Sequence, residues 1–232
     1  GRTPGMELVA VADLDGSAAR AAAEASGGDA IATTEPGLIF GDAVEPAFDV
    51  LVEASTAIGA AAHLCEEAIE RGLHVVLMNA EVDLAAGVEL AAAAARKGVV
   101  LTSDAGDQHG ALMRMIDEVR LWGLDVVMAG NIKGFLDRYA TAGGLIEEAR
   151  ARGLDPVQCC GNTDGTKLNI EMALVANATG LLPSVPGMHG PRLDTVDDVL
   201  SAFDLATCRD PGVVDYILGA EPGGGVFVVG HS

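Results

Sequence analysis

Short apolar runs alternate with helical stretches over the first 130 residues of the chain. The runs are continuous and rich in Val and Leu, as expected for strands buried on both faces of a parallel sheet. They cover residues 6–13, 48–55, 74–79, 99–104 and 124–130. The intervening stretches, predicted to be helices, are 17–26, 57–72, 84–98 and 109–123, and the last three end in Gly, a common helix terminator. This rhythm predicts an α/β fold with a doubly wound, Rossmann-type parallel sheet.

The rhythm changes after Gly130, where loops, one helix and a Pro- and Gly-rich stretch replace the alternation. The segment 163–177 is apolar around nearly its whole circumference, which predicts a largely buried helix. Two strand-like segments, 212–220 and 223–232, close the chain, and the last stops within an apolar run. We therefore predict a Rossmann-type domain over 1–130 and a smaller α+β domain over 131–232, which is incomplete at its C-terminus.

The composition narrows the classes of partner. A net charge of −20 and a pI near 4.3 repel phosphate backbones, which argues against nucleic acid. Because no apolar run approaches the roughly 20 residues that cross a bilayer, we expect no membrane association. The four cysteines form no spaced zinc pattern, and a reduced cytoplasmic compartment is the simplest interpretation.

A dinucleotide-binding sheet carries an Asp or Glu at the end of its second strand, about 20 residues after a glycine-rich loop. The segment VAVADLD ends in such an acid, Asp13 or Asp15, but counting back about 20 residues from Asp13 passes residue 1. Three interpretations stay open. The chain lacks the first strand and loop of a longer protein, the domain never bound a nucleotide, or the loop is built elsewhere, as in the glycine-rich segment 219–225.

Polar residues follow the next predicted strands, at the edge where open parallel sheets bind their ligands. Ser55 and Thr56 follow one strand, and Asn79 and Glu81 follow another. These four residues are candidates for contact with a cofactor. The alternative is that Ser55 or Thr56 only caps the next helix and that Asn79 belongs to a turn.

The segment SDAGDQHG, residues 103–110, places further polar residues at a strand end. Asp107 and Gln108 are candidates for positioning a polar substrate. We interpret His109 as an ordinary residue at the start of a helix.

Lysine is scarce, and two of the three lysines lie in segments of interest. Lys133 follows a predicted strand between Gly130 and Gly134, where a lysine can polarise a carbonyl oxygen or bind a phosphate. The alternative is an ordinary surface lysine in a loop.

Lys167 and Glu171 lie one turn apart on the buried helix predicted above, and Asp164 precedes it. On a solvated face such a pair stabilises a helix by roughly a few tenths of a kcal/mol. On a buried face the two charges must compensate each other or bind a polar ligand. Because the polar face is narrow, we interpret it as the wall of a cleft, with Lys133, Asp164, Lys167 and Glu171 as candidate catalytic residues.

The loop VPGMHGPRLD, residues 185–194, presents His189 and Arg192 between two prolines. A stiff loop can hold these side chains for recognition of a carboxylate or phosphate, which makes them candidate substrate-binding residues. A plain crossover loop is the alternative.

In this order, the segments resemble the homoserine-dehydrogenase-like oxidoreductases with a C-terminal SAF domain, a group that includes the deoxyxylulose-phosphate-reductoisomerase-like enzymes. The resemblance covers most of the chain and is most specific in TDGTKLNIEMALVANATGL and PGMHGP. It implies an NAD(P)-binding Rossmann domain, truncated here at its N-terminus, followed by a catalytic and dimerisation domain. It also implies that Asp13 contacts the ribose of the cofactor and that the four candidate catalytic residues face the substrate.

These observations predict an NAD- or NADP-dependent oxidoreductase, in homodimeric form, that acts on a small hydroxylated or phosphorylated carbonyl compound. A reductoisomerase of the deoxyxylulose-phosphate type, which would need a divalent metal, is the alternative enzyme. A non-catalytic ligand-binding or assembly domain is the alternative from another class. The order of Lys167 before Glu171 differs from that in true homoserine dehydrogenases, so the resemblance does not imply homoserine as substrate.

Overall fold

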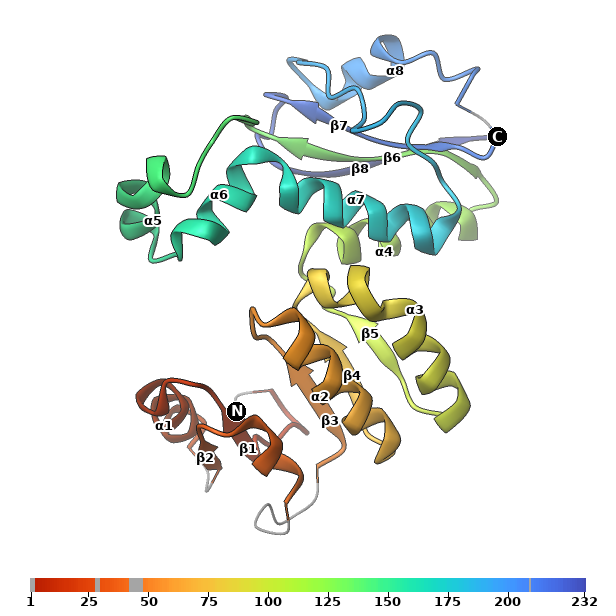
Figure 1. Ribbon diagram of the computed structural model, residues 1–232. Coiled ribbons are helices and arrows are strands. Elements are labelled where there is room, and N and C mark those ends of the chain that lie inside the picture. The colour runs from red at the N-terminus through yellow and green to blue at the C-terminus, as the bar shows by residue number, and fades with distance from the viewer. Residues whose placement is uncertain (1–2, 28–29, 42–47, 209) are drawn as a thin grey trace. The chain divides into compact units, whose positions relative to one another are not determined.

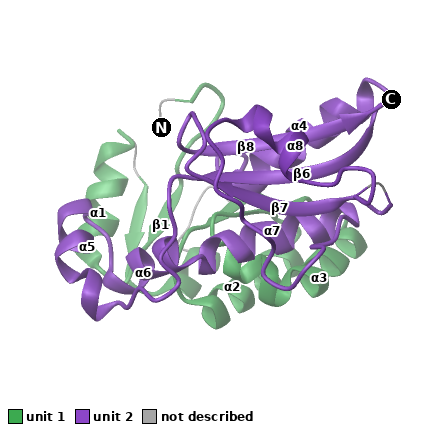
Figure 2. Cartoon of the chain, turned by 90° about the horizontal axis from the view of Figure 1, so that it is seen from above, with its two compact units in different colours: residues 1–103 green, residues 104–232 purple. Residues whose placement is uncertain are grey.

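The computed structural model of the chain describes residues 3–27, 30–41, 48–208 and 210–232. The chain divides after Ser103 into two compact units, residues 1–103 and 104–232 (Figure 2). The boundary that we predicted near residue 130 differs from this division. The reason is packing, since apolar residues of α4 (Gln108–Leu121) and β6 (Asp125–Lys133) belong to the core of the second unit.

The first unit alternates strands and helices, as predicted, but the strand Ile31–Thr33 was not among the predicted ones. Its strands are β1 (Ala10–Ala12), β2 (Ile31–Thr33), β3 (Val50–Glu53), β4 (His74–Leu77) and β5 (Leu101–Ser103). Its helices are α1 (Gly16–Ala25), the short 3₁₀ helix η1 (Pro36–Phe40), α2 (Ile58–Glu70) and α3 (Ala80–Lys97).

The strands of the first unit pair in parallel in two groups, β1 with β2 and β3 with β4 and β5. In the doubly wound order 3-2-1-4-5-6, they correspond to strands 2, 3, 4, 5 and 6. Strand 1, which would lie between β1 and β3, has no counterpart among the residues that the structure describes. This pattern confirms the predicted Rossmann-type sheet that lacks its first strand.

The strands of the first unit are not buried on both faces, contrary to the prediction. In β3, Leu51 and Glu53 are buried, whereas Val50 and Val52 are exposed. The buried side chains form a core with α2 and α3, and the alternation arises because successive residues of a strand face opposite sides of the sheet.

The ends of α1 and α2 lie within two residues of the predicted ones, but α3 begins at Ala80, four residues before its predicted start. Asp15 caps α1 by accepting hydrogen bonds from the backbone of Ser17 and Ala18, and Asn79 caps α3 in the same way. Gly98 ends α3 in the left-handed conformation, which an achiral residue adopts without strain. Asn79 therefore has at least the structural role that the sequence left open.

The second unit consists of a three-stranded sheet with helices. After α4 and β6 come the 3₁₀ helix η2 (Gly143–Leu145), α5 (Ile146–Arg152), α6 (Pro156–Asp164) and α7 (Thr166–Thr179). The short helices η3 (Val196–Asp198) and α8 (Val199–Ala202) precede the last two strands, β7 (Val213–Leu218) and β8 (Gly225–His231).

The sheet of the second unit is mixed. The central strand β6 pairs in parallel with β7 and antiparallel with β8. Helices α4 and α7 lie along one face of this sheet, and α8 lies on the other side (Figure 1). Two apolar cores, one on each face, hold these layers together.

Two elements of the second unit differ from the prediction in ways that affect the site. Strand β6 extends to Lys133, so this lysine is the last residue of a strand and not part of the loop after it. Asp164 is the last residue of α6, and α7 begins after the left-handed Gly165. Both differences arise because pairing and packing continue beyond the apolar runs in the sequence.

Gly130 shows why one position of β6 excludes a side chain. A Cβ atom at this residue would collide with the ring of Phe227 from the neighbouring strand. Gly130 therefore makes room for the ring of Phe227 in the core.

We expect Gly130→Ala to lower the free energy of unfolding by about 1–3 kcal/mol, because the added methyl group overpacks the core. Urea unfolding followed by circular dichroism measures the effect. Gly161→Ala in α6 is the control, since a Cβ there meets only Thr166, at 4.0 Å, and should be neutral or stabilising. Equal stabilities of the two variants would contradict the packing argument.

Candidate active site

A cluster of charged and amide side chains lies between the sheet and the helices of the second unit. Strand β6 contributes Asn131 and Lys133, which lie two residues apart and therefore face the same side of the sheet. Helix α7 contributes Lys167 and Glu171, which lie one helical turn apart.

The first turn of α4 completes this cluster. Asp107 is the N-cap of α4 and accepts a hydrogen bond from the backbone N–H of Gln108, the first residue of the helix. The side chains of both residues reach the groups from β6 and α7.

Glu171 is the centre of the cluster. Its side chain is only 1% exposed, and its Oε2 accepts a hydrogen bond of 3.1 Å from Asn131 Nδ2. Lys133 Nζ lies 3.8 Å from Oε2, and Lys167 Nζ lies 3.8 Å from Oε1. Each oxygen of the buried carboxylate therefore faces its own ammonium group.

The environment of Glu171 favours its neutral form. Burial raises the pKa of Glu171 to about 7. The Lys133 ammonium opposes this rise, the Asp107 carboxylate adds to it, and the Lys167 ammonium opposes it again. The group is thus poised to gain or lose a proton near neutral pH.

Asp107 is charged in the same surroundings. Burial alone would raise the pKa of Asp107, but the hydrogen bond from Lys167, together with that from the backbone of Gln108, lowers the pKa below its usual value. Lys167 Nζ lies 3.0 Å from Asp107 Oδ2. The two acids of the cluster therefore have opposite tendencies, a condition typical of sites that transfer protons.

Two amide side chains fix the geometry of the lysine from β6. Lys133 Nζ donates a hydrogen bond of 2.8 Å to Gln108 Oε1, and Asn131 Nδ2 donates a second, short hydrogen bond to the same oxygen. Asn131 is fully buried and links Gln108 to Glu171. The ammonium of Lys133 is thereby held in a defined position, with its side chain 20% exposed.

The sequence analysis missed Asn131. The sequence feature that could have revealed Asn131 is its position two residues before Lys133. Residues two apart in a strand face the same side, so both face the site if the strand reaches Lys133. The structure thus brings together five of the candidates and adds one. The six residues of this lysine–glutamate cluster are Asp107, Gln108, Asn131, Lys133, Lys167 and Glu171.

Asp164 lies apart from the lysine–glutamate cluster. Its carboxylate accepts a hydrogen bond of 2.8 Å from the backbone of Thr166 and a weak one from the Cys160 thiol. Among the residues that the structure describes, these contacts do not include any member of the cluster. A catalytic role of Asp164 stays a prediction.

His189 lies beside a buried carboxylate that the sequence analysis did not single out. Its Nδ1 is 2.9 Å from Asp215 Oδ2, and the backbone N–H groups of His189, Gly190 and Tyr216 also donate to this carboxylate. Asp215 is the partner of Gly130 in the sheet, so its side chain faces away from Asn131 and the cluster. His189 therefore lies on the other face, and its substrate contact stays a prediction.

Arg192 lies on the same face as the lysine–glutamate cluster. It forms an isolated parallel bridge with Leu218 of β7, and Leu218 is in turn the partner of Lys133 in β6. Residues in register on parallel strands point to the same face, and their Cα atoms on strands two apart are separated by roughly 10 Å. The exposed Arg192 and Lys133 therefore flank Leu218 at the carboxyl end of this sheet.

The candidate cofactor residues all lie at the carboxyl ends of strands in the first unit. Asp13 follows β1 and is exposed, with Oδ1 accepting a hydrogen bond from the backbone of Asp15. Ser55 and Thr56 follow β3 and are exposed. An exposed carboxylate in this place fits the hydroxyl groups of a ribose.

Two buried polar residues lie beside these positions in the first unit. Asn79 donates a hydrogen bond of 2.7 Å to the carbonyl oxygen of Ser55, which ties the ends of β3 and β4 together. Glu53 is buried, and its Oε1 accepts a hydrogen bond from the backbone of Ser55, while its Oε2 has no hydrogen-bond partner within the described part of the chain. Glu81 is partly exposed in the first turn of α3.

Comparison with known families agrees with this division of the chain. Residues 106–232 match the family model described as the catalytic domain of oxidoreductase DRL, which is more than half of the chain. The chain belongs to this family. Residues 2–103 match the NAD-binding domain of homoserine dehydrogenase. The two matches agree with the predicted oxidoreductase class and with the predicted dinucleotide-binding domain.

Solved structures show similar folds at low identity. The WlbA dehydrogenase of Bordetella pertussis, in complex with NADH and UDP-GlcNAcA, is 21% identical with a TM-score of 0.44, covering 63% of this chain and 44% of its own. An NAD-binding oxidoreductase of Klebsiella pneumoniae is 23% identical with a TM-score of 0.40, covering 56% and 34%. The DRL-family chain thus spans less than half the length of these proteins. No curated protein matches it.

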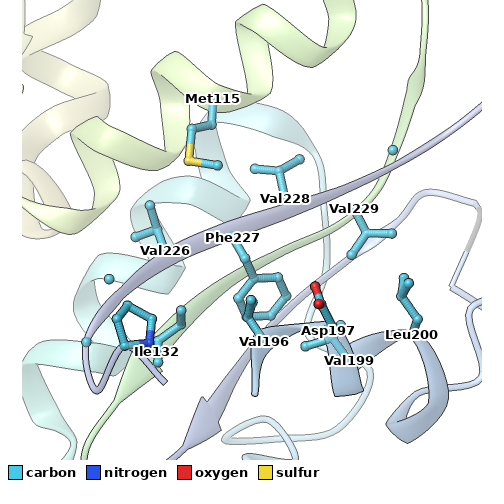
Figure 3. A pocket seen from close by; sticks show the side chains of 14 residues that line it. Met115, Ile132, Val196, Asp197, Val199, Leu200, Val226, Phe227, Val228 and Val229 are labelled. Atoms are coloured by element: carbon cyan, nitrogen blue, oxygen red, sulfur yellow. The ribbon is translucent and has the colours of Figure 1, made fainter. Parts of the chain in front are cut away.

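The second unit also has an apolar groove that is separate from the lysine–glutamate cluster. It has a volume of about 540 Å³ and runs along β8, where Val226, Phe227 and Val229 line it together with Val196 and Leu200 (Figure 3). None of the candidate site residues lines this groove.

A membrane-spanning helix and a group of metal ligands are both absent from the residues that the structure describes. No helix among them is both long and apolar enough to cross a membrane. In the same part of the chain, no three His, Cys, Asp or Glu side chains are grouped as ligands for a metal ion.

The raised pKa of Glu171 predicts a specific dependence of stability on pH. Between the ordinary pKa of 4.5 and about 7, the folded protein holds a proton that the unfolded chain has lost, so stability falls as the pH rises. Glu171→Gln removes this loss. We expect the free energy of unfolding of the variant, relative to the parent, to improve by about 3 kcal/mol between pH 4 and pH 8.

Urea unfolding at several pH values measures this difference. Glu147→Gln, at an exposed glutamate of α5, is the control and should show almost no dependence. A constant difference between Glu171→Gln and the parent across this range would refute the raised pKa.

Proposed function

We propose that the DRL-family chain is part of an NAD-dependent enzyme that transfers hydride to or from a small hydroxylated or phosphorylated carbonyl compound. The observation that carries this proposal is the buried Glu171 carboxylate between two partly exposed ammonium groups, Lys133 and Lys167. Such a site stabilises charge that develops on a substrate oxygen during reduction of a carbonyl group.

The two lysines are the members of the lysine–glutamate cluster that meet the substrate. Their side chains are 20% and 39% exposed, for Lys133 and Lys167, so both ammonium groups can reach a ligand. An ammonium group next to a carbonyl oxygen polarises the bond and compensates the negative charge on the resulting alkoxide. The NAD cofactor, when bound, supplies or accepts the hydride.

Glu171 acts through the lysines and does not touch the substrate, because its side chain is 1% exposed. Its role is to fix the positions of the two ammonium groups, one at each carboxylate oxygen, and to exchange a proton with them. A proton affinity that is balanced near neutral pH suits this exchange in both directions of the reaction.

Arg192 supports a substrate that carries an anionic group. Together with Lys133 it presents two cations on one face of the sheet in a chain with a net charge of −20. A phosphate or carboxylate group between them would orient the substrate by paired hydrogen bonds from the guanidinium. We keep Asp164 and His189 as candidate residues at the edges of the substrate site.

The candidate cofactor-binding residues all belong to the first unit. We assign Asp13 to the ribose of NAD, and Ser55, Thr56, Asn79 and Glu81 to the crevice at the ends of β3 and β4. The exposed position of Asp13 and the tie between Asn79 and Ser55 support this assignment.

Some parts of the proposal rest on the family resemblance. These are the use of NADP in place of NAD, a C-terminal SAF domain, a homodimer in the cytoplasm, and a rearrangement of the carbon skeleton before reduction. A panel of small hydroxy acids and sugar phosphates, assayed by NADH absorbance with and without a chelator, tests the chemistry. Loss of activity on chelation would favour the reductoisomerase alternative.

We expect Lys167→Met to lower turnover by about 100-fold or more, because an ammonium group that stabilises the developing charge is lost. The free energy of unfolding should change by only about 1 kcal/mol, since Lys167 is partly exposed. Lys97→Met is a matched control, because Lys97 is also 39% exposed and also pairs with a carboxylate. Similar losses of turnover in both variants would remove Lys167 from the catalytic site.

We expect Asp13→Asn to weaken NADH binding by about 10-fold, since a hydrogen bond to a charged group is worth about 1.5–3 kcal/mol. Fluorescence titration of NADH with the full-length protein measures this change. Glu7→Gln is the control, because this exposed residue precedes β1 at its opposite end. Equal affinities of parent and Asp13→Asn would show that the cofactor does not use this carboxylate.

A further inference from the structure

We infer that Asp107 and Glu171 share a single proton and that Asp107 conducts this proton between the buried Glu171 and water. The inference deepens the proposed function and rests on it for its catalytic meaning, because it concerns the same lysine–glutamate cluster. It assigns Asp107, which we had expected to position the substrate, to a different task.

The two oxygens of Glu171 are not equivalent. Oε2 accepts a hydrogen bond from Asn131 Nδ2, an amide nitrogen that only donates, and the second hydrogen bond of this nitrogen goes to Gln108 Oε1. Oε1 is buried, and no donor among the residues that the structure describes lies within hydrogen-bonding distance of it. A proton on Glu171 therefore resides on Oε1, and Asn131 is the positioning residue that determines this choice.

Oε1 of Glu171 is also the oxygen that faces Lys167, at 3.8 Å. The same ammonium lies 3.0 Å from Asp107 Oδ2, so Lys167 draws both carboxyl groups toward one point. A protonated Glu171 can then donate a hydrogen bond to Asp107, and two carboxyl groups this close resist being ionised together.

Solvent access distinguishes the two acids. The side chain of Asp107 is 20% exposed, whereas that of Glu171 is 1% exposed. Asp107 is held at the N-terminus of α4 by the backbone N–H of Gln108, which leaves it charged and able to accept a proton from Glu171. A proton on Glu171 therefore reaches water through Asp107.

The charged and titratable groups around this pair come from each element packed against it. Strand β6 presents Lys133, α7 presents Lys167, and the first turn of α4 presents His109 near Asp107. The two ammonium groups balance the pair when it is fully ionised. With one proton bound, the cluster has a net charge of +1, which favours an anionic substrate.

The step balances in the proposed reaction. When a hydroxyl group is oxidised, its carbon loses a hydride to the cofactor, and its O–H bond breaks to release one proton. This proton passes through Lys167, the lysine that faces Oε1 of Glu171, to that oxygen, then to Asp107 and to water. Reduction of the carbonyl group takes up one proton by the reverse path.

A carboxyl-carbon NMR titration of the free protein, labelled at Asp and Glu, tests the shared proton. In the parent, we expect the Asp107 and Glu171 signals to shift together in a step near neutral pH. In Asp107→Asn, Glu171 should bind its proton about tenfold more weakly, because the neighbouring negative charge is gone. Asp117→Asn changes the same charge at an exposed position on the same helix and should leave Glu171 unaffected.

A Glu171 signal that does not respond to Asp107→Asn, or an Asp107 signal without a step near neutral pH, would overturn the inference. If Asp107→Asn fails to fold, Lys167→Met provides the second test, since loss of this cation should raise the pKa of Glu171. An unchanged Glu171 titration in that variant would equally overturn it.

Kinetic measurements distinguish a failure of this inference from a failure of the proposed function. Asp107→Asn should lower turnover without changing NADH affinity, and added formate should restore part of the rate by replacing the missing carboxylate. If the NMR titrations of Asp107 and Glu171 are coupled but the protein has no dehydrogenase activity, the shared proton is supported and the proposed function is refuted. Activity in Asp107→Asn equal to that of the parent at every pH would refute the proton path.

Discussion

The burial of one carboxylate constrains the architecture of the second unit. Glu171 has no solvent to compensate its charge, so charged and amide groups from β6, α4 and α7 must surround it. This requirement fixes the distance of α7 from the sheet and the rotation of both helices about their axes. Without these partners the helix would expose Glu171 to an apolar core at a cost of several kcal/mol.

The same constraint links stability to chemistry. A buried acid that is held partly neutral destabilises the folded protein above neutral pH, and such a cost is typical of functional sites. The amide of Asn131 connects the strand to the helix and leaves one oxygen of Glu171 without a donor. The structure thereby retains a group whose proton can move, while its position is rigid.

The buried Asp215 shows the contrasting case on the other face of the sheet. Three backbone N–H groups and the imidazole of His189 satisfy this carboxylate, and the surrounding loop contains Met188 and Gly190 with positive φ. Gly190 lies against the ring of Tyr216, where a Cβ atom would collide. This acid stabilises the backbone of a loop through its hydrogen bonds.

The sequence by itself determined most of the alternation of strands and helices in the first unit and the ends of α1 and α2. It also placed Lys167 and Glu171 on one helix face, because the α-helical repeat is a local property of the chain. It correctly indicated that a narrow polar face on an apolar helix needs a partner. These features depend on periodicity and on residues a few positions apart.

Only the tertiary structure decided which partners meet. Asn131 was missed because the apolar run of β6 ends before it, and the strand continues to Lys133 through pairing with β7. Asp215 was missed because its partners lie about 25 residues away along the chain. Asp164 and Glu171 were both candidate catalytic acids in the sequence, yet Asp164 accepts a hydrogen bond from the backbone of Thr166 and Glu171 is buried among cations. Such distinctions depend on long-range packing, which the local pattern of apolar and polar residues does not encode.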